Sequence, residues 1–410
     1  MESPFLTAEH IRLAAEAWAF ARDSVAPTAA AEETEDGDAL ARRFVQRMAE
    51  GGLLRHCVPQ AFGGAAELVS IRSLCLIREA LAYASGLCDA MFALQGLGSG
   101  PITFFGDEAQ RQAWLPKVAA GTAIAAFALT EPGAGSDLGS IATEARRENS
   151  HYVLNGVKRF ISNAGIADFY VVFAKTGEED GSAGRRAEAD GRSARSPEQG
   201  QGRLTAFLVP ADNPGLRVQE RLELIAAHPI GEIGLEGCRI PRSAAIGGEG
   251  RGLAVALATL DAFRPTVGSA AIGLARRALD ETLDHVSQRV QFGKPLAEQQ
   301  GVQFMLADMA TEIDAARLLV YRAAYRKDMG QPRITLEAAM AKAYATEAAQ
   351  RVVDHAVQLH GGNGVVRGYE VERLYREVRA LRIYEGATEV QKTIIAREML
   401  KHHLGKESGE

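Results

Sequence analysis

The chain has 410 residues, of which 47% are hydrophobic and 24% are charged. This length predicts two or three domains, and the composition excludes a disordered chain and a collagen-like fibre. The 46 basic and 52 acidic side chains give a net charge of −6, so we expect no nucleic-acid partner. The first ten residues do not have the pattern of a signal peptide, and no stretch approaches the roughly 20 apolar residues of a membrane helix. We therefore expect a soluble, cytoplasmic protein without membrane insertion.

The four cysteines, Cys57, Cys75, Cys88 and Cys238, include no CxxC pair. They predict ordinary reduced thiols rather than a disulfide framework or a zinc site, and we expect no metal.

Residues 1–125 are predicted to form a helical domain. Ala, Leu, Arg and Glu dominate this stretch, and glycine or proline marks the breaks. Asp107 is a candidate N-cap for a helix that is expected to end near Pro116.

Residues 126–248 are predicted to form a β-domain. Asn155-Gly156 lies between two β-type runs, which predicts a hairpin with a tight turn. Residues 168–175 and 204–209 are two further predicted strands. The intervening stretch, residues 176–203, contains no Val, Ile, Leu, Met or aromatic residue. It therefore predicts a mobile surface insertion, with a docking segment as the alternative.

Residues 249–410 are predicted to form a helical bundle. Val302, Met305, Leu306, Met309 and Ile313 follow the spacing of a buried helical stripe, which indicates core packing. Breaks are expected at residues 292–295, 329–332 and 361–368.

Several common catalytic motifs are absent. The sequence contains no GxGxxG, no GxxxxGK[ST], no HExxH and no GxSxG. Nucleotide hydrolysis, zinc proteolysis and α/β-hydrolase chemistry are therefore disfavoured.

Three local patterns remain. Residues 129–137 form a polar, glycine-containing loop that follows an apolar run, which suits either a ligand-facing loop or a plain turn. Residues 358–364 hold three glycines within four positions, which suits close approach by a ligand or a helix C-cap. Residues 383–389 place Glu385 beside apolar neighbours, which suits a general base or a solvated surface carboxylate.

In this order, the three patterns resemble the acyl-CoA dehydrogenase family over nearly the whole chain. Residues 128–140 fit the first signature of that family without a departure. Residues 358–377 fit the second with one departure, Gly368, where the family usually has an acidic or amide side chain. Arg289 with Phe292-Gly293, and Leu260-Asp261 with Arg264, are further landmarks of the family.

The resemblance implies a multidomain α+β fold with an N-terminal helical domain, a middle β-barrel-like domain and a C-terminal helical bundle. It implies a homotetramer, built as a dimer of dimers, that binds FAD without a covalent bond. The implied reaction is oxidation of an acyl-CoA thioester to the trans-2-enoyl-CoA, with electrons passed to an electron-transfer flavoprotein.

The resemblance also implies roles for individual residues. Glu385 matches the catalytic base, and its backbone N–H, with a flavin hydroxyl, would hold the substrate carbonyl. Some members place the base at the position of Phe263, which cannot serve here. The implied FAD contacts are Phe127, Leu129, Thr130, Gly135, Ser136, Phe160, Ser162, Gln358, Gly361, Gly362, Thr388 and Glu389, with Arg289, Phe292 and Gln300 from a neighbouring subunit. The implied substrate contacts are Ser136, Asp261, Arg264 and Gly386, although Asp261 and Arg264 also fit a simple ion pair.

Alternatives remain open. An oxidase or monooxygenase of the same fold would use oxygen, and a flavin-binding scaffold would have no activity. The acyl group is not determined by the sequence, although Leu94, Gln95 and Tyr384 are expected around the floor of the pocket. His228 lies in a stretch, residues 224–230, that departs from the family, and it is interpreted as a loop residue or, alternatively, a pocket residue.

Overall fold

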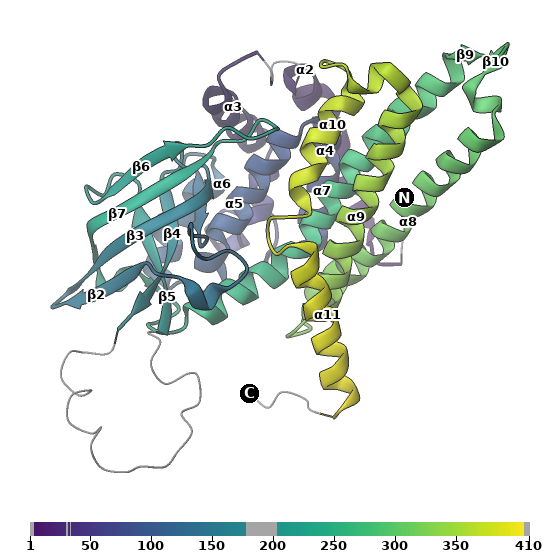
Figure 1. Cartoon of the computed structure of the whole chain (residues 1–410). Helices are drawn as coiled ribbons and strands as arrows, with labels where there is room; N and C mark the ends of the chain where they lie inside the picture. The colour runs from purple at the N-terminus through teal and green to yellow at the C-terminus, as the bar shows by residue number, and fades with distance from the viewer. Residues whose placement is uncertain (1–3, 30–31, 33, 178–202, 406–410) are drawn as a thin grey trace.

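The computed structural model describes residues 4–29, 32, 34–177 and 203–405. Figure 1 shows short and medium helices first, then a twisted sheet, then a bundle of long helices that lies beside both. This order of helices, sheet and helices agrees with the predicted fold class. Most of the predicted insertion 176–203 lies outside the described residues.

In the N-terminal part, α4, whose side chains are almost all buried, packs against α1 and α5, while α3 and α6 pack against α5. Their bounds are α1 Ala8–Phe20, α2 Ala26–Ala29, α3 Gly37–Glu50, α4 Ile71–Ala84, α5 Gly86–Phe105 and α6 Glu108–Ala119. Asp107 caps α6 as predicted, with Gln110 completing a capping box. The expected end at Pro116 is wrong, because the Pro116 carbonyl still accepts a hydrogen bond from the Ala120 N–H in the last turn.

The middle part of the chain is one sheet, in the order β6-β7-β3-β2-β4-β5-β8, with β1 parallel to β4. The strands are β1 Ala125–Ala128, β2 Glu144–Glu148, β3 His151–Ser162, β4 Phe169–Thr176, β5 Arg203–Pro210, β6 Leu216–Arg221, β7 Ile230–Pro241 and β8 Ala245–Ile246. The two predicted strands at 168–175 and 204–209 are confirmed as β4 and β5. Thr176 and Arg203 lie opposite each other, so the chain leaves and re-enters the sheet at one place.

The predicted hairpin at Asn155-Gly156 is wrong. β3 runs straight through this dipeptide, and the register with β7 shifts there. Gly156 has a φ of +152°, and a Cβ at this position would stand 2.5 Å from the hydroxyl of Thr143. The glycine therefore serves a bulge and a close approach, while the tight turn falls at Asn149, before β3.

The expectation of a barrel-like middle domain is also corrected, because the sheet does not close. Its two outer strands, β6 and β8, do not pair with each other. Gln110 of α6 covers the β8 edge by donating to the carbonyls of Ser243 and Ala245 at 2.7 and 3.2 Å. The β6 edge carries exposed charged and polar residues, which discourage pairing with another strand.

The C-terminal helices form an antiparallel bundle around the 37-residue α7. The bounds are α7 Gly252–Gln288, α8 Gln300–Asp328, α9 Thr335–His360, α10 Glu370–Leu381 and α11 Thr388–His403. All three predicted breaks fall between these helices. Of the predicted stripe on α8, Met309 and Ile313 are buried.

All four cysteines are buried and free, as expected. Within the described ranges, no helix is long and apolar enough to cross a bilayer. The described residues also contain no group of three or more side chains suited to hold a metal ion.

Close packing between α4 and α7 gives a stability prediction. Gly273 of α7 faces α4 so closely that a Cβ would stand 2.3 Å from the Glu79 carbonyl oxygen. We expect Gly273→Ala to lower the free energy of unfolding by about 1–3 kcal/mol, because neither backbone can yield without repacking. Chemical denaturation measures this change. The matched control is Gly301→Ala in α8, where no atom lies within 4 Å of the added Cβ, and an equal loss in both variants would contradict the argument.

Candidate active site

Glu385 lies in the turn between α10 and α11, in the left-handed region with a φ of +53°. Gly386 follows with a φ of +97°, so two consecutive residues turn the chain sharply. The carbonyls of both residues accept hydrogen bonds. Arg264 Nε donates to Glu385 O at 3.4 Å, Lys342 Nζ donates to Gly386 O at 2.8 Å, and Gln391 donates to both. Side chains of α7, α9 and α11 therefore hold this turn.

The carboxylate of Glu385 sits in a low-dielectric environment. Glu385 is half-buried, and its Oε2 atom is buried with no hydrogen-bond partner among the described residues. Burial raises the pKa of this carboxyl, while Arg78, Lys342 and Arg264 act in the opposite direction. An unpaired carboxylate of raised pKa is suited to accept a proton from a bound ligand.

Sequence reasoning missed two of the three cations that surround Glu385. Arg78 of α4 is 2% exposed, pairs with Asp89 through two hydrogen bonds of 2.8 and 2.7 Å, and donates to Thr266. Lys342 of α9 is fully buried, and burial lowers its pKa to about 8. A charged residue within an apolar helical run was the available signal in both cases.

The predicted loop 129–137 is anchored by Glu131. Its carboxylate accepts hydrogen bonds from Ala142 N and Thr143 N and pairs with Lys158 at 2.7 Å. Burial would raise the pKa of Glu131, but the bonds from Lys158 and Thr143 outweigh it and lower the pKa. Lys158 also donates to Leu129 O at 3.1 Å, so the start of the loop is attached to β3.

The end of β3 lies against the same loop. The Arg159 N–H donates to Thr130 O at 2.9 Å, and the β3–β7 register shifts between Lys158 and Ile161. At this shift Phe160 takes a φ of +58° and leaves its ring 54% exposed. The structure thus brings together Thr130, Phe160 and Ser162, three residues predicted to bind one ligand.

The three glycines that follow α9 have different roles. Gly364 is required by packing, because a Cβ would stand 2.3 Å from the Val357 carbonyl, and Gly361 has a φ of +60°. Gly362 has no atom within 4 Å of an added Cβ, and neither do Gly361 and Gly135. Open space beside exposed glycines leaves their backbone accessible to a ligand.

A cavity of about 320 Å³ reaches Arg264, whose guanidinium also contacts the turn at Glu385 and Gly386. Asp261 and Arg264 line it and form an ion pair, and Thr335 donates to Asp261 at 2.5 Å. Lys327 and Arg397 also line the cavity, and the sequence did not single them out. The predicted substrate contacts Asp261, Arg264 and Gly386 therefore lie close together.

Three models of one family match this chain in order: the acyl-CoA dehydrogenase N-terminal domain at residues 7–122, the middle domain at 126–238 and the C-terminal domain at 250–400. The chain belongs to the acyl-CoA dehydrogenase family. Its members are oxidoreductases that act on CH–CH groups.

Relatives and solved structures agree with this membership. An acyl-CoA dehydrogenase of Bacillus subtilis is 38% identical over 93% of this chain and 95% of its own. A 3-(aryl)acrylate reductase of Clostridium sporogenes is 36% identical over 97% of this chain and 100% of its own. Butyryl-CoA dehydrogenase from Megasphaera elsdenii superposes with a TM-score of 0.86 at 32% identity, over 98% of this chain and 100% of its own. An acyl-CoA dehydrogenase from Bacillus anthracis complexed with FAD gives a TM-score of 0.86 at 29% identity, over 99% of this chain and 69% of its own.

The residues of this chain fit a flavin on structural grounds. An exposed aromatic ring at Phe160, an adjoining polar loop and open space at Gly135 suit a flat, polar-edged ring system. Gly361 and Gly362 lie elsewhere, because they follow His360, whose ring stacks on His285 near Arg289 at the far end of the bundle. Phe127 is half-buried on β1 and packs 4.9 Å from the ring of Phe173, so its ring belongs partly to the core. Thr388, at the start of α11, is 4% exposed and donates to Glu347 at 2.8 Å, while Glu389 beside it is exposed.

A second group of predicted residues lies away from the base turn. Arg289 and Phe292 belong to the link between α7 and α8, and Gln300 begins α8. Figure 1 shows this end of the bundle, marked by the short strands β9 Val290–Gln291 and β10 Lys294–Pro295, far from the large sheet. Phe292 is 95% exposed. Within one chain, these residues do not join the loop 129–137.

The expected pocket floor needs a correction at Gln95. This side chain is fully buried, donates to Ala123 O and accepts from Ala125 N, so both ends of its amide join α5 to β1. Both ends of the Gln95 amide are used within the protein, and the side chain is not exposed to a substrate.

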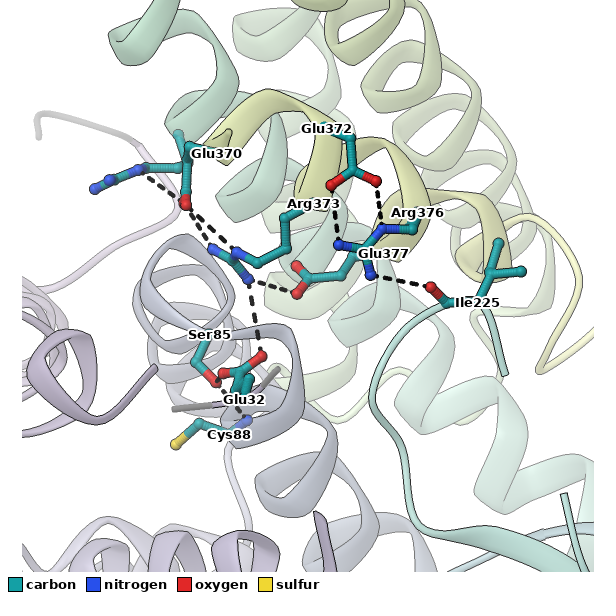
Figure 2. Close-up of polar contacts among 10 residues, drawn as sticks. Glu32, Ser85, Cys88, Ile225, Glu370, Glu372, Arg373, Arg376 and Glu377 are labelled. Carbon is teal, nitrogen blue, oxygen red and sulfur yellow. Dashed lines mark hydrogen bonds and ion pairs between the residues drawn. The ribbon is translucent and has the colours of Figure 1, made fainter. Parts of the chain in front are cut away.

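Helix α10 links the base turn to the other domains through ion pairs (Figure 2). Arg373 pairs with Glu370 and Glu377 on its own helix, and Glu32 of the N-terminal part lies 3.9 Å away. Burial and the nearby Glu377 raise the pKa of Glu32 to about 8. On the opposite side, Arg376 pairs with Glu372.

Lys342→Met tests the electrostatics of the base. As the predicted base, Glu385 would act only when ionised. Losing the Lys342 cation should raise the pKa of Glu385, so the acid limb of the pH–rate profile should move to higher pH. At pH values well above that limb, the rate should recover toward that of the parent enzyme. The measurement is the rate of flavin reduction by an acyl-CoA across pH.

The control for this variant is Thr346→Val, one turn along α9, which removes a buried hydroxyl bonded to the Lys342 carbonyl. It should leave the acid limb in place. An unmoved limb in Lys342→Met would show that the ammonium does not act on the base.

Proposed function

We propose that this chain is an FAD-dependent acyl-CoA dehydrogenase that converts an acyl-CoA thioester to the trans-2-enoyl-CoA, with Glu385 as the base. The observation that carries the proposal is the buried, unpaired Oε2 of Glu385 on a turn fixed by three side chains. Membership of the acyl-CoA dehydrogenase family supports the reaction class. The neighbour complexed with FAD supports the cofactor.

The reaction needs a base because the proton next to a thioester carbonyl is only weakly acidic. A carboxylate in a dry site is a stronger base than one in water, because burial disfavours its charge. The cations of Arg78, Lys342 and Arg264 limit this rise in pKa, because each favours the ionised carboxylate. Negative charge that develops on the carbonyl oxygen requires hydrogen-bond donors, and the backbone N–H of Glu385 is proposed as one.

FAD supplies the two-electron acceptor for the hydride from the β-carbon. The chain contributes the alignment: Thr130, Phe160 and Ser162 are proposed to face the flavin ring, while Asp261, Arg264 and Gly386 face the substrate. An electron-transfer flavoprotein is the proposed acceptor of the electrons. Because one relative is named a reductase, the reverse reaction is the second candidate, with the same carboxyl as the proton donor.

Glu385→Gln tests the base. The amide keeps the shape of the side chain and cannot take a proton, so anaerobic bleaching of the oxidised flavin band by an acyl-CoA should slow by about 10²- to 10⁴-fold. FAD content and acyl-CoA binding should remain, because neither contact requires the carboxylate charge. The parent enzyme is first assayed with straight, branched and aromatic acyl-CoA thioesters. The thioester that it oxidises fastest is then used in this assay.

The matched control is Glu312→Gln on α8, whose carboxylate pairs only with Arg351 among the described residues and lies outside the proposed site. It should bleach at the parent rate. Near-normal bleaching by Glu385→Gln would refute the assignment of the base.

The far group of predicted FAD contacts gives a second test. We propose that Arg289 and Phe292 reach the FAD of a neighbouring subunit in a homotetramer, since Phe292 is almost fully exposed. Arg289→Ala should lower the flavin content and weaken the oligomer together, whereas the exposed Arg22→Ala on the N-terminal helices should change neither. Flavin absorbance per subunit and mass by light scattering measure both effects. Full flavin occupancy in a monomer would contradict the proposed contact between subunits.

A further inference from the structure

His228 forms a hydrogen bond with a residue of the proposed flavin site. It lies in the loop between β6 and β7. The side chain is half-buried, and its Nε2 lies 2.7 Å from the hydroxyl oxygen of Ser162 at the end of β3. His228 is therefore a loop residue that also borders the proposed flavin site, so it has features of both interpretations given from the sequence.

Three hydrogen bonds fix the loop that carries His228. The Pro229 carbonyl accepts from Asn163 N at 2.6 Å, and the Leu222 N–H donates to Ile230 O at 3.0 Å. At the middle of the loop, the Ile225 carbonyl accepts from Arg376 of α10 at 3.1 Å (Figure 2). The loop that carries His228 is thus held by the sheet at its ends and by the helical bundle at its middle.

Ser162 itself stands in a strained piece of backbone. Phe160 and Asn163, on either side, both have a positive φ, at a cost of about 1–3 kcal/mol each. Asn163 is fully buried and donates to Ala125 O at 2.9 Å, which holds the strained end of β3 against β1. Strain that the surrounding structure maintains in this way is typical of a site that presents particular groups to a ligand.

We propose that His228 is a positioning residue, which fixes the hydroxyl of Ser162 toward FAD and through it makes the reduction potential of the cofactor less negative. The inference rests on the proposed function, because it takes Ser162 as a flavin contact. The chemistry follows from the proton count of a hydroxyl, which has one hydrogen to donate. When the imidazole Nε2–H donates to the Ser162 oxygen, that hydrogen is left for an acceptor on the flavin edge.

The imidazole acts in its neutral form. Burial alone lowers the pKa of His228 to about 4. Several charged groups on the elements packed around it form ion pairs: Arg159 of β3 with Glu220 of β6 and Glu232 of β7, Arg221 of β6 with Asp38 of α3, and Arg376 of α10 with Glu372. A fixed donor stabilises an electron-rich flavin more than a rotating one, so loss of the imidazole should favour the oxidised form.

The test measures the reduction potential and the absorption spectrum of the purified holoenzyme. His228→Phe keeps a ring of similar size and removes both nitrogens. It should make the potential more negative by about 30 mV, a tenfold change in the reduction equilibrium for a two-electron couple. The offset should be the same at pH 6, 7 and 8, because His228 does not titrate there. Should His228→Phe fail to fold, His228→Leu replaces it.

Ser162→Ala and the double variant show whether His228 acts through Ser162. Ser162→Ala should shift the potential in the same direction, and adding His228→Phe should cause no further shift. His228→Gln supplies a neutral amide donor. Its reduction potential should therefore lie closer to that of the parent protein than to that of His228→Phe. The control is His151→Ala: the chain has a second histidine–serine pair at the exposed start of β3, with Ser150 Oγ 2.9 Å from His151 Nδ1, and its loss should leave the flavin unchanged.

The outcomes separate this inference from the proposed function. If Ser162→Ala shifts the potential but neither His228→Phe nor His228→Leu does, the flavin contact stands and the role of His228 is overturned. Additive shifts in the double variant would also overturn it, because they show independent action. If Ser162→Ala itself changes neither potential nor spectrum, the proposed flavin contact fails and this inference fails with it.

Discussion

The left-handed turn at Glu385 is the constraint on which the proposed chemistry depends. The positive φ of Glu385 is unfavourable for a residue with a Cβ, and the turn persists because donors from three helices bind its carbonyls. Two of those donors, Arg264 and Lys342, are charged and buried, so the groups that shape the backbone also set the electrostatics of the carboxylate. The same two side chains therefore influence both the position and the pKa of Glu385, the proposed base.

The second half of the site depends on the irregular end of strand β3. Pairing of β3 with β7 shifts register near its end, and this irregularity turns Phe160 outward while Lys158 points inward to Glu131. The ion pair of Lys158 and Glu131 is buried away from water, and it attaches the polar loop to the strand. A regular β3 would place Phe160 and Ser162 on the same face of the sheet as the buried Lys158.

Helix α10 joins these two halves. Its Arg373 pairs with Glu32 of the N-terminal part, and its Arg376 donates a hydrogen bond to the Ile225 carbonyl of the β6–β7 loop. The helix ends at Leu381, just before the turn that holds Glu385. The loop that holds His228 and the turn that holds Glu385 are consequently attached to one rigid element. This arrangement gives a physical route by which the flavin end and the base end of the site keep a fixed relation.

The sequence by itself determined the family, the order of helices, sheet and helices, and the candidate base, because long signatures and hydrophobic periodicity are local properties of the chain. It failed where the outcome depends on contacts between distant segments. Asn155-Gly156 has the local chemistry of a hairpin, but the approach of Thr143 and pairing with β7 make it a bulge. Gln95 has the family position of a pocket residue, but its amide is used between α5 and β1. Arg78, Lys342 and His228 acquire their roles only when α4, α9 and the β6–β7 loop pack beside Glu385 and Ser162, since burial and proximity, which set the pKa and the hydrogen-bond partner, exist only in the folded chain.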